Sequence, residues 1–215
     1  MAEGKVAVVG SGLIGRCWSM MFARAGYSVQ IFDINPEQVK TALVSIKEQL
    51  EALHAVDLLE GQTVDEVFER VSGAADLAGA LEGAVHCQEC CPESIPLKIK
   101  VFQSLDEVAD DKIVLASSSS CICPSDFTKD LKHKAQVLVA HPVNPPHFIP
   151  LVEIVPSPAT DPAVTAATTA LMKKLGQAPV TLKKEANGFI LNRLQCVAGH
   201  AQPRQPLRPS HPLRP

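Results

Sequence analysis

The chain has 215 residues, of which 46% are hydrophobic, and its formal net charge is −3. This length and composition are enough for one large domain with a real core, so the sequence predicts a soluble globular protein. Basic residues do not cluster before the C-terminal tail, which argues against nucleic acid and membrane partners and favours a small molecule. No apolar run approaches the roughly 20 residues of a membrane span, and a strand-like segment already begins at Lys5, leaving no room for a transit peptide. We therefore expect a cytoplasmic protein.

Apolar runs alternate with helical patterns along the chain. The expected strands cover residues 5–10, 27–33, 84–90, 112–118, 136–143, 150–156 and 178–184. The expected helices cover 13–26, a long segment from Pro36 past Leu53, 64–81 with an interruption near Gly73, 94–110, and a segment from Pro162 to Gly176. This alternation predicts an α/β fold of the Rossmann type, with a doubly wound, mostly parallel sheet.

The seven cysteines are an odd number in a chain without a secretory signal, which predicts free thiols. Cys87 and Cys90 form a C-x-x-C pair. A structural zinc site needs four ligands at regular spacing, and no second pair or nearby histidine completes the set. We therefore expect buried thiols here and no metal.

The stretch VAVVGSGLIG places Gly10, Gly12 and Gly15 directly after a strand and at the start of a helix. This G-x-G-x-x-G spacing suits a dinucleotide, because the glycines permit a tight turn, close approach to a pyrophosphate, and close packing of helix on strand. The helix N-terminus then offers unpaired N–H groups to the phosphates. The glycines alone give weak support for a dinucleotide site.

Asp33 strengthens this interpretation, because it closes the second strand, where a carboxylate can accept hydrogen bonds from both ribose hydroxyls. The same carboxylate would repel a 2′-phosphate. Ile34, Asn35 and Pro36 supply no arginine to neutralise one, so NAD is favoured over NADP. FAD stays open on the motif alone, since flavoproteins use the same turn.

A second group of polar residues lies in the segment AHPVNPPHFIPLVEIVP. His141 ends one expected strand and Glu153 lies in the next, and the proline-rich loop between them can return Glu153 beside His141. A histidine held by a carboxylate is a good general base, which the dehydrogenation of an alcohol requires. From spacing alone, a structural histidine at a strand end is the alternative.

Several segments in order resemble the 3-hydroxyacyl-CoA dehydrogenase superfamily, and within it the branch of lambda-crystallin and L-gulonate 3-dehydrogenase: VAVVGSGLIG, FD, SSSSC, HPVNPP, LVEIVP and GFILNRLQ. The resemblance extends from about residue 5 to Gln195. It implies NAD as the cofactor, with contacts from Gly10, Gly12, Leu13, Ile14, Gly15, Asp33, Glu93 and Lys98.

The resemblance also implies catalytic positions at Ser120, His141, Glu153 and Asn192, and substrate contacts at Ser120, Asn144 and Asn192. His141 would act as the base and Glu153 would orient it, while Ser120 and Asn192 would hydrogen-bond the reacting oxygen. Without the resemblance, SSSSC is interpreted as a helix-capping loop and Asn192 as a solvated helix residue. Glu93 and Lys98 are then ordinary charges at a helix start.

Two departures from the hydroxyacyl-CoA pattern favour the sugar-acid branch. Ser118, Ser119 and Ser120 stand where Asn-Thr-Ser is usual, and HPVNPP stands where HFFNP is usual. The implied function is NAD-dependent oxidation of the C3 hydroxyl of L-gulonate to 3-dehydro-L-gulonate. The alternatives are the same chemistry on a 3-hydroxyacyl-CoA, and a non-catalytic, lens-type structural or NAD-binding protein.

The sequence divides into a NAD-binding domain at 1–186, the start of the family's second, all-helical domain at 187–196, and a Pro/Arg-rich tail at 197–215. In the family the helical domain forms a homodimer and closes the substrate cleft, and the resemblance leads us to expect that it is largely missing here. Proline at every third position from 203 to 215 predicts a disordered tail, with a groove-binding segment as the alternative. We therefore expect NAD binding with little turnover, and the family's dimerisation is in question for this chain.

Overall fold

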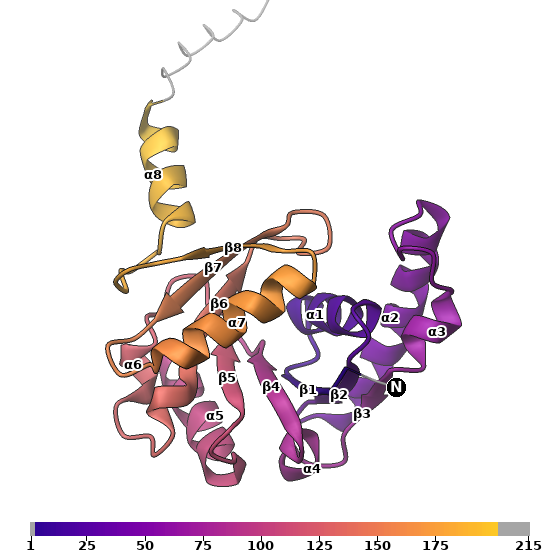
Figure 1. Ribbon diagram of the computed structural model, residues 1–215, viewed down its shortest axis with the longest axis horizontal. Coiled ribbons are helices and arrows are strands. Elements are labelled where there is room, and N and C mark those ends of the chain that lie inside the picture. Colours follow the sequence, from indigo (N-terminus) through magenta and orange to yellow (C-terminus); the bar gives the residue numbers. More distant parts are fainter. Residues whose placement is uncertain (1–2, 202–215) are drawn as a thin grey trace, which may run out of the picture.

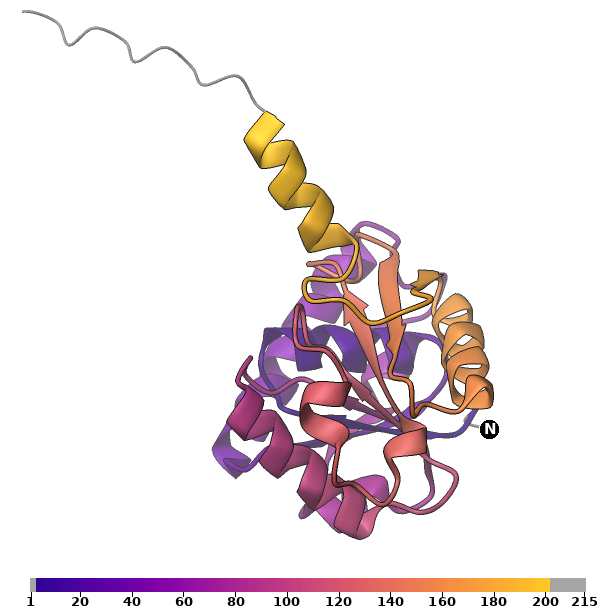
Figure 2. The same ribbon diagram turned by 90° about the vertical axis from the view of Figure 1, so that its left-hand side faces the viewer.

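The computed structural model describes residues 3–201, and in this range a sheet of eight strands forms the middle layer with helices on both faces (Figures 1 and 2). The strands are β1 (Lys5–Val9), β2 (Ser28–Phe32), β3 (Val71–Gly73), β4 (Ala84–Glu89), β5 (Val114–Ser117), β6 (Val137–Pro142), β7 (Leu151–Pro156) and β8 (Ala178–Thr181). The helices are α1 (Leu13–Arg24), α2 (Pro36–Ala55), α3 (Val64–Phe68), α4 (Leu77–Leu81), α5 (Ile95–Val108), α6 (Ser125–Thr128), α7 (Pro162–Lys174) and α8 (Leu191–Ala201), with a 3₁₀ turn η1 (Lys134–Gln136).

The strands run in the order β3-β2-β1-β4-β5-β6-β7-β8. Neighbouring strands are parallel except for β6 and β7, which are antiparallel. The predicted doubly wound, mostly parallel sheet is therefore confirmed. Because β2 lies on one side of β1 and β4 on the other, the chain switches direction at β1. Sheets of this kind bind ligands outside the carboxyl ends of the strands at such a switch.

Strand β1 contributes to two apolar cores. Val6 and Val8 pack in the cluster that includes Trp18 of α1, whereas Ala7 and Val9 pack in the cluster that includes Phe102 of α5. Successive side chains of a strand point to opposite faces, so a strand covered by helices on both sides is apolar at every position. This explains the continuous apolar run VAVV at residues 6–9.

The segment 64–81 differs from the single interrupted helix that the sequence predicted. α3 and α4 are separate short helices, and 71–73 between them form the edge strand β3 beside β2. Thr63 and Glu66 form a capping box at the start of α3, and the Asp76 side chain caps α4. The prediction was wrong because the backbone pairing at an open sheet edge overrode a helical pattern.

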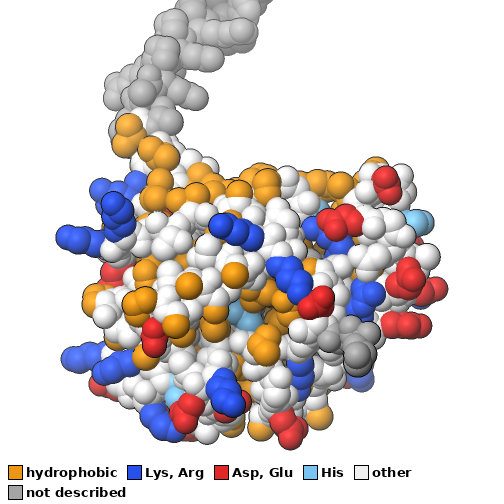
Figure 3. All heavy atoms as spheres, in the orientation of Figure 1, with side chains coloured by type: hydrophobic (Ala, Val, Ile, Leu, Met, Phe, Trp, Pro, Cys, Tyr) orange, Lys and Arg blue, Asp and Glu red, His pale blue; other side chains and the backbone are white. Residues whose placement is uncertain are grey.

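Helix α8, yellow in Figures 1 and 2, projects away from the body of the molecule. The helix expected to begin within 187–196 starts at Leu191 and runs to Ala201, past the expected boundary at 197. Leu194 and Val197 on this helix are exposed, and Figure 3 shows apolar side chains, in orange, near its base. The prolines from 203 to 215, on which the prediction of a disordered tail rests, lie outside the described residues.

His86 is a buried histidine in the central strand β4. Its Nε2 lies 3.0 Å from Oε1 of Gln88, its ring contacts Phe22, and burial lowers its pKa to about 4. The unfolded chain protonates such a ring at a pKa of about 6.5, so the stability contributed by the neutral ring is present above that pH and is lost as the pH falls toward 4.

We expect this histidine to contribute about 3 kcal/mol to the decrease in the free energy of unfolding between neutral pH and pH 4. Urea unfolding measured over this pH range tests the expectation. The His86→Phe variant should show a correspondingly weaker pH dependence, and an unchanged pH dependence in the variant would rule the assignment out.

Candidate active site

The turn after β1 is built on close backbone contacts. Gly10 has a φ of +100°, and its N–H donates to the carbonyl of Phe32 at 2.8 Å. A Cβ on Gly10 would lie 2.8 Å from the carbonyl carbon of Cys90, and a Cβ on Gly15 would lie 1.9 Å from the carbonyl oxygen of Gly10. Neither position has room for a side chain, as the glycine motif predicts.

Gly12 in the same turn has free space around it. Its φ is −65°, and a Cβ there would meet nothing within 4 Å. It is the N-cap of α1, whose start has neither a side-chain cap nor an acidic residue in its first turn. Leu13, exposed, and Ile14, half-buried, follow it. The helix start therefore leaves its N–H groups and its positive dipole end to an anion, and this geometry fits the pyrophosphate of NAD.

Asp33 lies just after β2, and the glycine turn holds its carboxylate. Ser11 donates its N–H and its hydroxyl to Oδ2 at 2.9 and 2.7 Å, and the N–H of Asn35 donates to Oδ1 at 3.1 Å. Burial by itself would raise the pKa of Asp33, but these hydrogen bonds outweigh it and hold the pKa below its ordinary value. Asp33 is therefore ionised at neutral pH and suited to accept from ribose hydroxyls. Sequence reasoning missed Ser11, whose signal was a hydroxyl directly after the first glycine.

Replacing Asp33 by Asn should weaken NAD binding about tenfold to a hundredfold, because hydrogen bonds to a charged acceptor are the stronger ones. The loss of charge should also narrow the preference for NADH over NADPH. Since the pKa of Asp33 is lowered by folding, its contribution to stability is present above the unfolded pKa and is lost as the pH falls through the lowered one. Because Asp33 stays ionised around neutral pH, the affinity of the wild-type chain for NAD should not change with pH in this range. Titrations with both cofactors measure these effects, and an unchanged ratio of affinities would remove Asp33 from the ribose site.

Strands β6 and β7 bring His141 and Glu153 together. The antiparallel register pairs the two residues, and Nδ1 of His141 lies 2.8 Å from Oε2 of Glu153. Glu153 is 1% exposed and His141 is 7% exposed, and the buried ring of Phe189 packs beside the imidazole. The predicted proximity of the two side chains is confirmed. If Nδ1–H donates to the carboxylate, Nε2 has the free lone pair that a general base needs.

Glu153 also connects this pair to the start of α8. Its Oε1 accepts the N–H groups of Ile190 at 2.7 Å and Leu191 at 3.0 Å. These N–H groups and the positive end of the helix stabilise a carboxylate that is otherwise removed from water. One side chain therefore orients His141 and also fixes the point at which α8 leaves the body. The sequence predicted only the first of these roles.

Asn192, in the first turn of α8, reaches the serine loop. Its Nδ2 donates to the carbonyl of Ser120 at 2.8 Å. Within the described residues the hydroxyl of Ser120 has no hydrogen bond, which leaves it open to a substrate. The four predicted catalytic residues are thus linked: His141 contacts Glu153, Glu153 contacts the helix start that carries Asn192, and Asn192 contacts Ser120.

Glu93 and Lys98, which we expected to contact NAD, have protein partners in this structure. Lys98 is 1% exposed, and its Nζ lies 2.9 Å from Oε2 of the buried Glu89 and 3.6 Å from Oε2 of Glu93. Oε1 of Glu93 accepts the Ser119 hydroxyl at 2.6 Å and the N–H of Ser120 at 3.0 Å. Burial would raise the pKa of Glu93, but the Ser119 hydroxyl and the Lys98 charge hold it below its ordinary value. Glu93 therefore fixes the serine loop, and its contact with NAD stays a prediction.

Glu89 is a site residue that sequence reasoning missed. It is fully buried at the end of β4, where it accepts from Lys98, from the Ser117 hydroxyl at 2.6 Å and from the N–H of Cys91 at 2.6 Å. A carboxylate at the end of a strand predicted to be buried was the available signal, because buried charges need partners.

Asn144 does not join this group. It is exposed in the loop between β6 and β7, and its side chain makes no hydrogen bond within residues 3–201. Its substrate contact stays a prediction.

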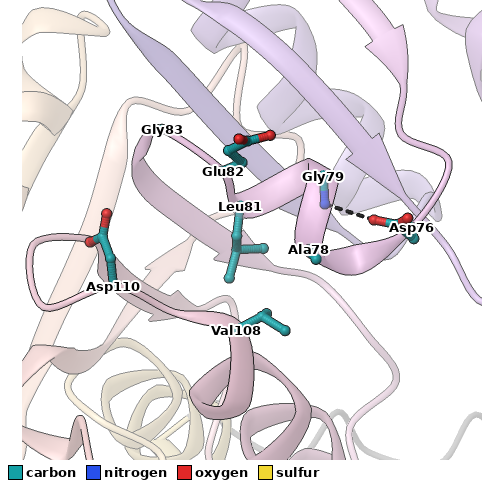
Figure 4. Close-up of a pocket in the computed structure, with 8 residues that line it drawn as sticks. All are labelled: Asp76, Ala78, Gly79, Leu81, Glu82, Gly83, Val108 and Asp110. Atoms are coloured by element: carbon teal, nitrogen blue, oxygen red, sulfur yellow. Dashed lines mark hydrogen bonds between the residues drawn. The ribbon is translucent and has the colours of Figure 1, made fainter.

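A hollow of about 590 Å³ lies at the other end of the strands from the predicted site residues (Figure 4). Asp76, Leu81 and Gly83 line it from the region of α4, and Val108 and Asp110 line it from the end of α5. Gly83 directly precedes β4 and Asp110 comes just before β5, so the hollow lies at the amino ends of these strands. The predicted site residues lie at the carboxyl ends, and the hollow contains none of them.

No cluster of three or more His, Cys, Asp or Glu within residues 3–201 could hold a metal ion. Cys87 is a buried free thiol and Cys90 a half-buried one. No helix in the same range has the length and apolar character needed to cross a membrane.

The chain is similar to a known protein family and to several characterised proteins. Residues 5–186 match the family model described as 3-hydroxyacyl-CoA dehydrogenase, NAD binding domain. A lambda-crystallin homolog from Bos taurus is 53% identical over 195 residues, which cover 90% of this chain and 61% of the relative. The L-carnitine dehydrogenase of Oceanobacillus iheyensis is 33% identical over 190 residues, covering 88% of this chain and 61% of the relative. The chain thus spans about three fifths of the length of these relatives.

A solved structure shows the same architecture. The 3-hydroxybutyryl-CoA dehydrogenase of Escherichia coli aligns with a TM-score of 0.84 at 28% identity, over 90% of this chain and 41% of that chain. The matched family model is a NAD-binding domain, and the residues of this chain that match it, 5–186, include the glycine turn, Asp33, His141 and Glu153. NAD is therefore the cofactor of this domain, as the turn and Asp33 predicted.

Proposed function

The chain belongs to the 3-hydroxyacyl-CoA dehydrogenase family, and on this basis we propose that it serves the NAD-dependent oxidation of a 3-hydroxy acid, with L-gulonate as the substrate and 3-dehydro-L-gulonate as the product. The observation that supports this best is the buried pair of His141 and Glu153, with Nδ1 to Oε2 at 2.8 Å. The chain spans about three fifths of its curated relatives, so the proposal concerns the site that these residues form.

The chemistry follows from the donor and acceptor roles of the site. NAD, when bound, accepts the hydride from C3 of the substrate. In the proposal, Nε2 of His141 removes the proton of the C3 hydroxyl, and Glu153 stabilises the imidazolium through Nδ1. The Ser120 hydroxyl and the second N–H of Asn192 hydrogen-bond the same oxygen while its charge develops. One proton goes to His141 and one hydride to the cofactor, which balances the two-electron oxidation.

The choice of substrate rests on polar groups around the site. L-gulonate presents several hydroxyls, and Ser120 and Asn192 offer a hydroxyl and an amide for them. Asn144, in the loop between β6 and β7, is proposed as a further contact. The relatives are named both for L-carnitine and for hydroxyacyl-CoA thioesters, so the family by itself does not choose between a free acid and a thioester. The three serines 118–120 and the segment HPVNPP are the sequence features that favour the sugar acid. The cytoplasmic location remains a prediction, and the family's homodimer remains in question for this chain.

The proposal is tested with the wild-type chain in two steps. NADH and NADPH titrations first establish cofactor binding, with NADH expected to bind more tightly. Initial rates of NADH formation are then compared for L-gulonate and 3-hydroxybutyryl-CoA, with the larger rate expected for L-gulonate. Activity with the thioester alone would assign the chain to the hydroxyacyl-CoA enzymes. Cofactor binding without turnover of either substrate would support the non-catalytic alternative.

A further inference from the structure

A polar network that the proposed reaction does not use lies beneath the candidate active site. Its centre is Gln88 of β4, whose side chain is fully buried. Oε1 of Gln88 lies 3.0 Å from Nε2 of His86. Nε2 of Gln88 donates to the Ser118 hydroxyl at 2.8 Å and to the carbonyl of Ala140 at 3.3 Å. One amide therefore contacts β4, the loop after β5, and β6.

The partners of Gln88 are close neighbours of two predicted catalytic residues. Ala140 directly precedes His141 in β6, and Ser118 stands two positions before Ser120 in the serine loop. Because β5 lies between β4 and β6 in the sheet, the Gln88 side chain reaches across β5 to the backbone that carries the base. No backbone hydrogen bond within residues 3–201 joins Ser118 to Ala140 directly.

The hydrogen bonds of the network are mutually consistent. A carbonyl only accepts, so the amide nitrogen of Gln88 must face Ala140 and its oxygen must face His86. His86 must then donate from Nε2, which fixes the tautomer of this buried ring. Ser118 Oγ accepts from Gln88 and from Trp18 Nε1 at 3.1 Å, and its own proton is left for Cys90 Sγ at 3.3 Å. These roles leave Gln88 a single orientation, although Nδ1 of His86 is buried without a hydrogen-bond partner within the described residues.

We infer that Gln88 is a positioning residue for the proposed dehydrogenase reaction, because its amide sets the serine loop and the His141 end of β6 at a fixed separation. The inference rests on the proposed function, in which Ser120 and His141 act on the same hydroxyl. Without the amide, the carbonyl of Ala140 and the hydroxyl of Ser118 each lose a hydrogen-bond donor. Both groups are largely removed from water, so the loss is costly. The two segments then shift relative to each other, while the Gly10–Gly15 turn and Asp33 keep their own contacts.

The first test replaces Gln88 by Met, which has a similar length and no hydrogen-bonding groups. Since small misplacements of reacting groups are costly, kcat for the 3-hydroxy acid should fall on the order of tenfold, with NAD affinity unchanged. Gln136→Met is the matched control. Gln136 is also a buried glutamine whose Nε2 donates to a backbone carbonyl, that of Asp110 at 3.0 Å, but it lies at the amino end of β6. The control should lose stability and keep its kcat.

A second variant separates positioning from general destabilisation. Gln88→Glu keeps the shape of the side chain but has no N–H to donate while it is ionised. Burial raises the pKa of such a carboxyl, and its protonated form recovers one donor. The kcat of Gln88→Glu relative to wild type should therefore rise as the pH is lowered at constant fold, and that of Gln136→Glu should not. A loss that is independent of pH and equal in both glutamate variants contradicts a positioning role.

A third measurement does not depend on turnover. The side-chain titration of His141 is followed by NMR without substrate, and the indole N–H of Trp18, the one tryptophan of the chain, reports whether the network is intact. In Gln88→Met both the indole signal and the His141 titration should change, and in Gln136→Met neither should. If the indole signal moves while His141 titrates as in wild type and kcat is retained, the inference is overturned. If the wild-type chain oxidises no hydroxy acid, the proposed function fails, and the His141 titration alone decides the inference.

Discussion

The His141→Asn variant is expected to lose about 10²–10⁴-fold in the rate of NADH formation, the range for the loss of a general base, and to keep its affinity for NAD. The asparagine amide can still donate to Oε2 of Glu153, which His141 Nδ1 contacts at 2.8 Å, so the buried carboxylate keeps a partner. The other carboxylate oxygen keeps its contacts with Ile190 and Leu191. The variant therefore removes Nε2, the proposed base, with little change to the fold. Initial rates and NADH titrations measure the two quantities.

His133→Asn is the matched control for this change. His133 is also buried, and its Nδ1 lies 2.9 Å from Oδ1 of Asp106, so it is a second histidine paired with a carboxylate. It precedes η1 at the amino end of β6, away from the glycine turn and the serine loop. We expect this variant to be somewhat less stable and to form NADH at the wild-type rate. Similar rates for wild type and His141→Asn would show that His141 is a structural histidine.

The Gly15→Ala variant should destabilise the fold by about 3 kcal/mol or more and should abolish NAD binding, because its Cβ cannot be accommodated without moving backbone. That Cβ would lie 1.9 Å from the carbonyl oxygen of Gly10. Gly10 cannot move away from this Cβ, because Gly10 is itself packed against the backbone of Cys90. A Cβ built on Gly10 would lie only 2.8 Å from the carbonyl carbon of Cys90. Urea unfolding and NADH titration measure the two losses. A variant with wild-type stability would mean that α1 and β1 are not packed this closely.

Gly12→Ala carries the same chemical change in the same turn without the clash. Its Cβ would meet no protein atom within 4 Å, and the φ of −65° suits alanine. The fold should therefore be at least as stable as wild type, whereas NAD binding should weaken, because the methyl group occupies the space through which the pyrophosphate approaches the backbone. Wild-type affinity in Gly12→Ala would place the phosphates elsewhere.

The parts of the site that could be predicted from sequence are those set by short stretches of chain. The spacing of Gly10, Gly12 and Gly15 predicts positions where the backbone has no room for a side chain. The structure confirms such close contacts at Gly10 and Gly15. The pairing of His141 with Glu153 was predictable because a strand, a short loop and a second strand return a side chain to its neighbour.

The rest depends on partners distant in sequence. Gln88 contacts residues 30 and 52 positions away, and no local pattern shows that a glutamine in the buried strand β4 will meet them. Lys98 was assigned to the cofactor through the family resemblance, and no local pattern showed that it would also be buried beside Glu89. Strand β3 was missed for a similar reason, since its pairing with β2 belongs to the sheet and not to its own residues.

The most direct test of the proposed chemistry is a single-turnover experiment with the wild-type chain in excess over NAD and with L-gulonate deuterated at C3. A slow enzyme still gives a signal under these conditions, because each active site needs to react only once. We predict NADH that carries the deuterium, formed more slowly than from unlabelled L-gulonate, and no comparable signal from His141→Asn. A chain that binds NAD and yields no NADH from L-gulonate would contradict the account.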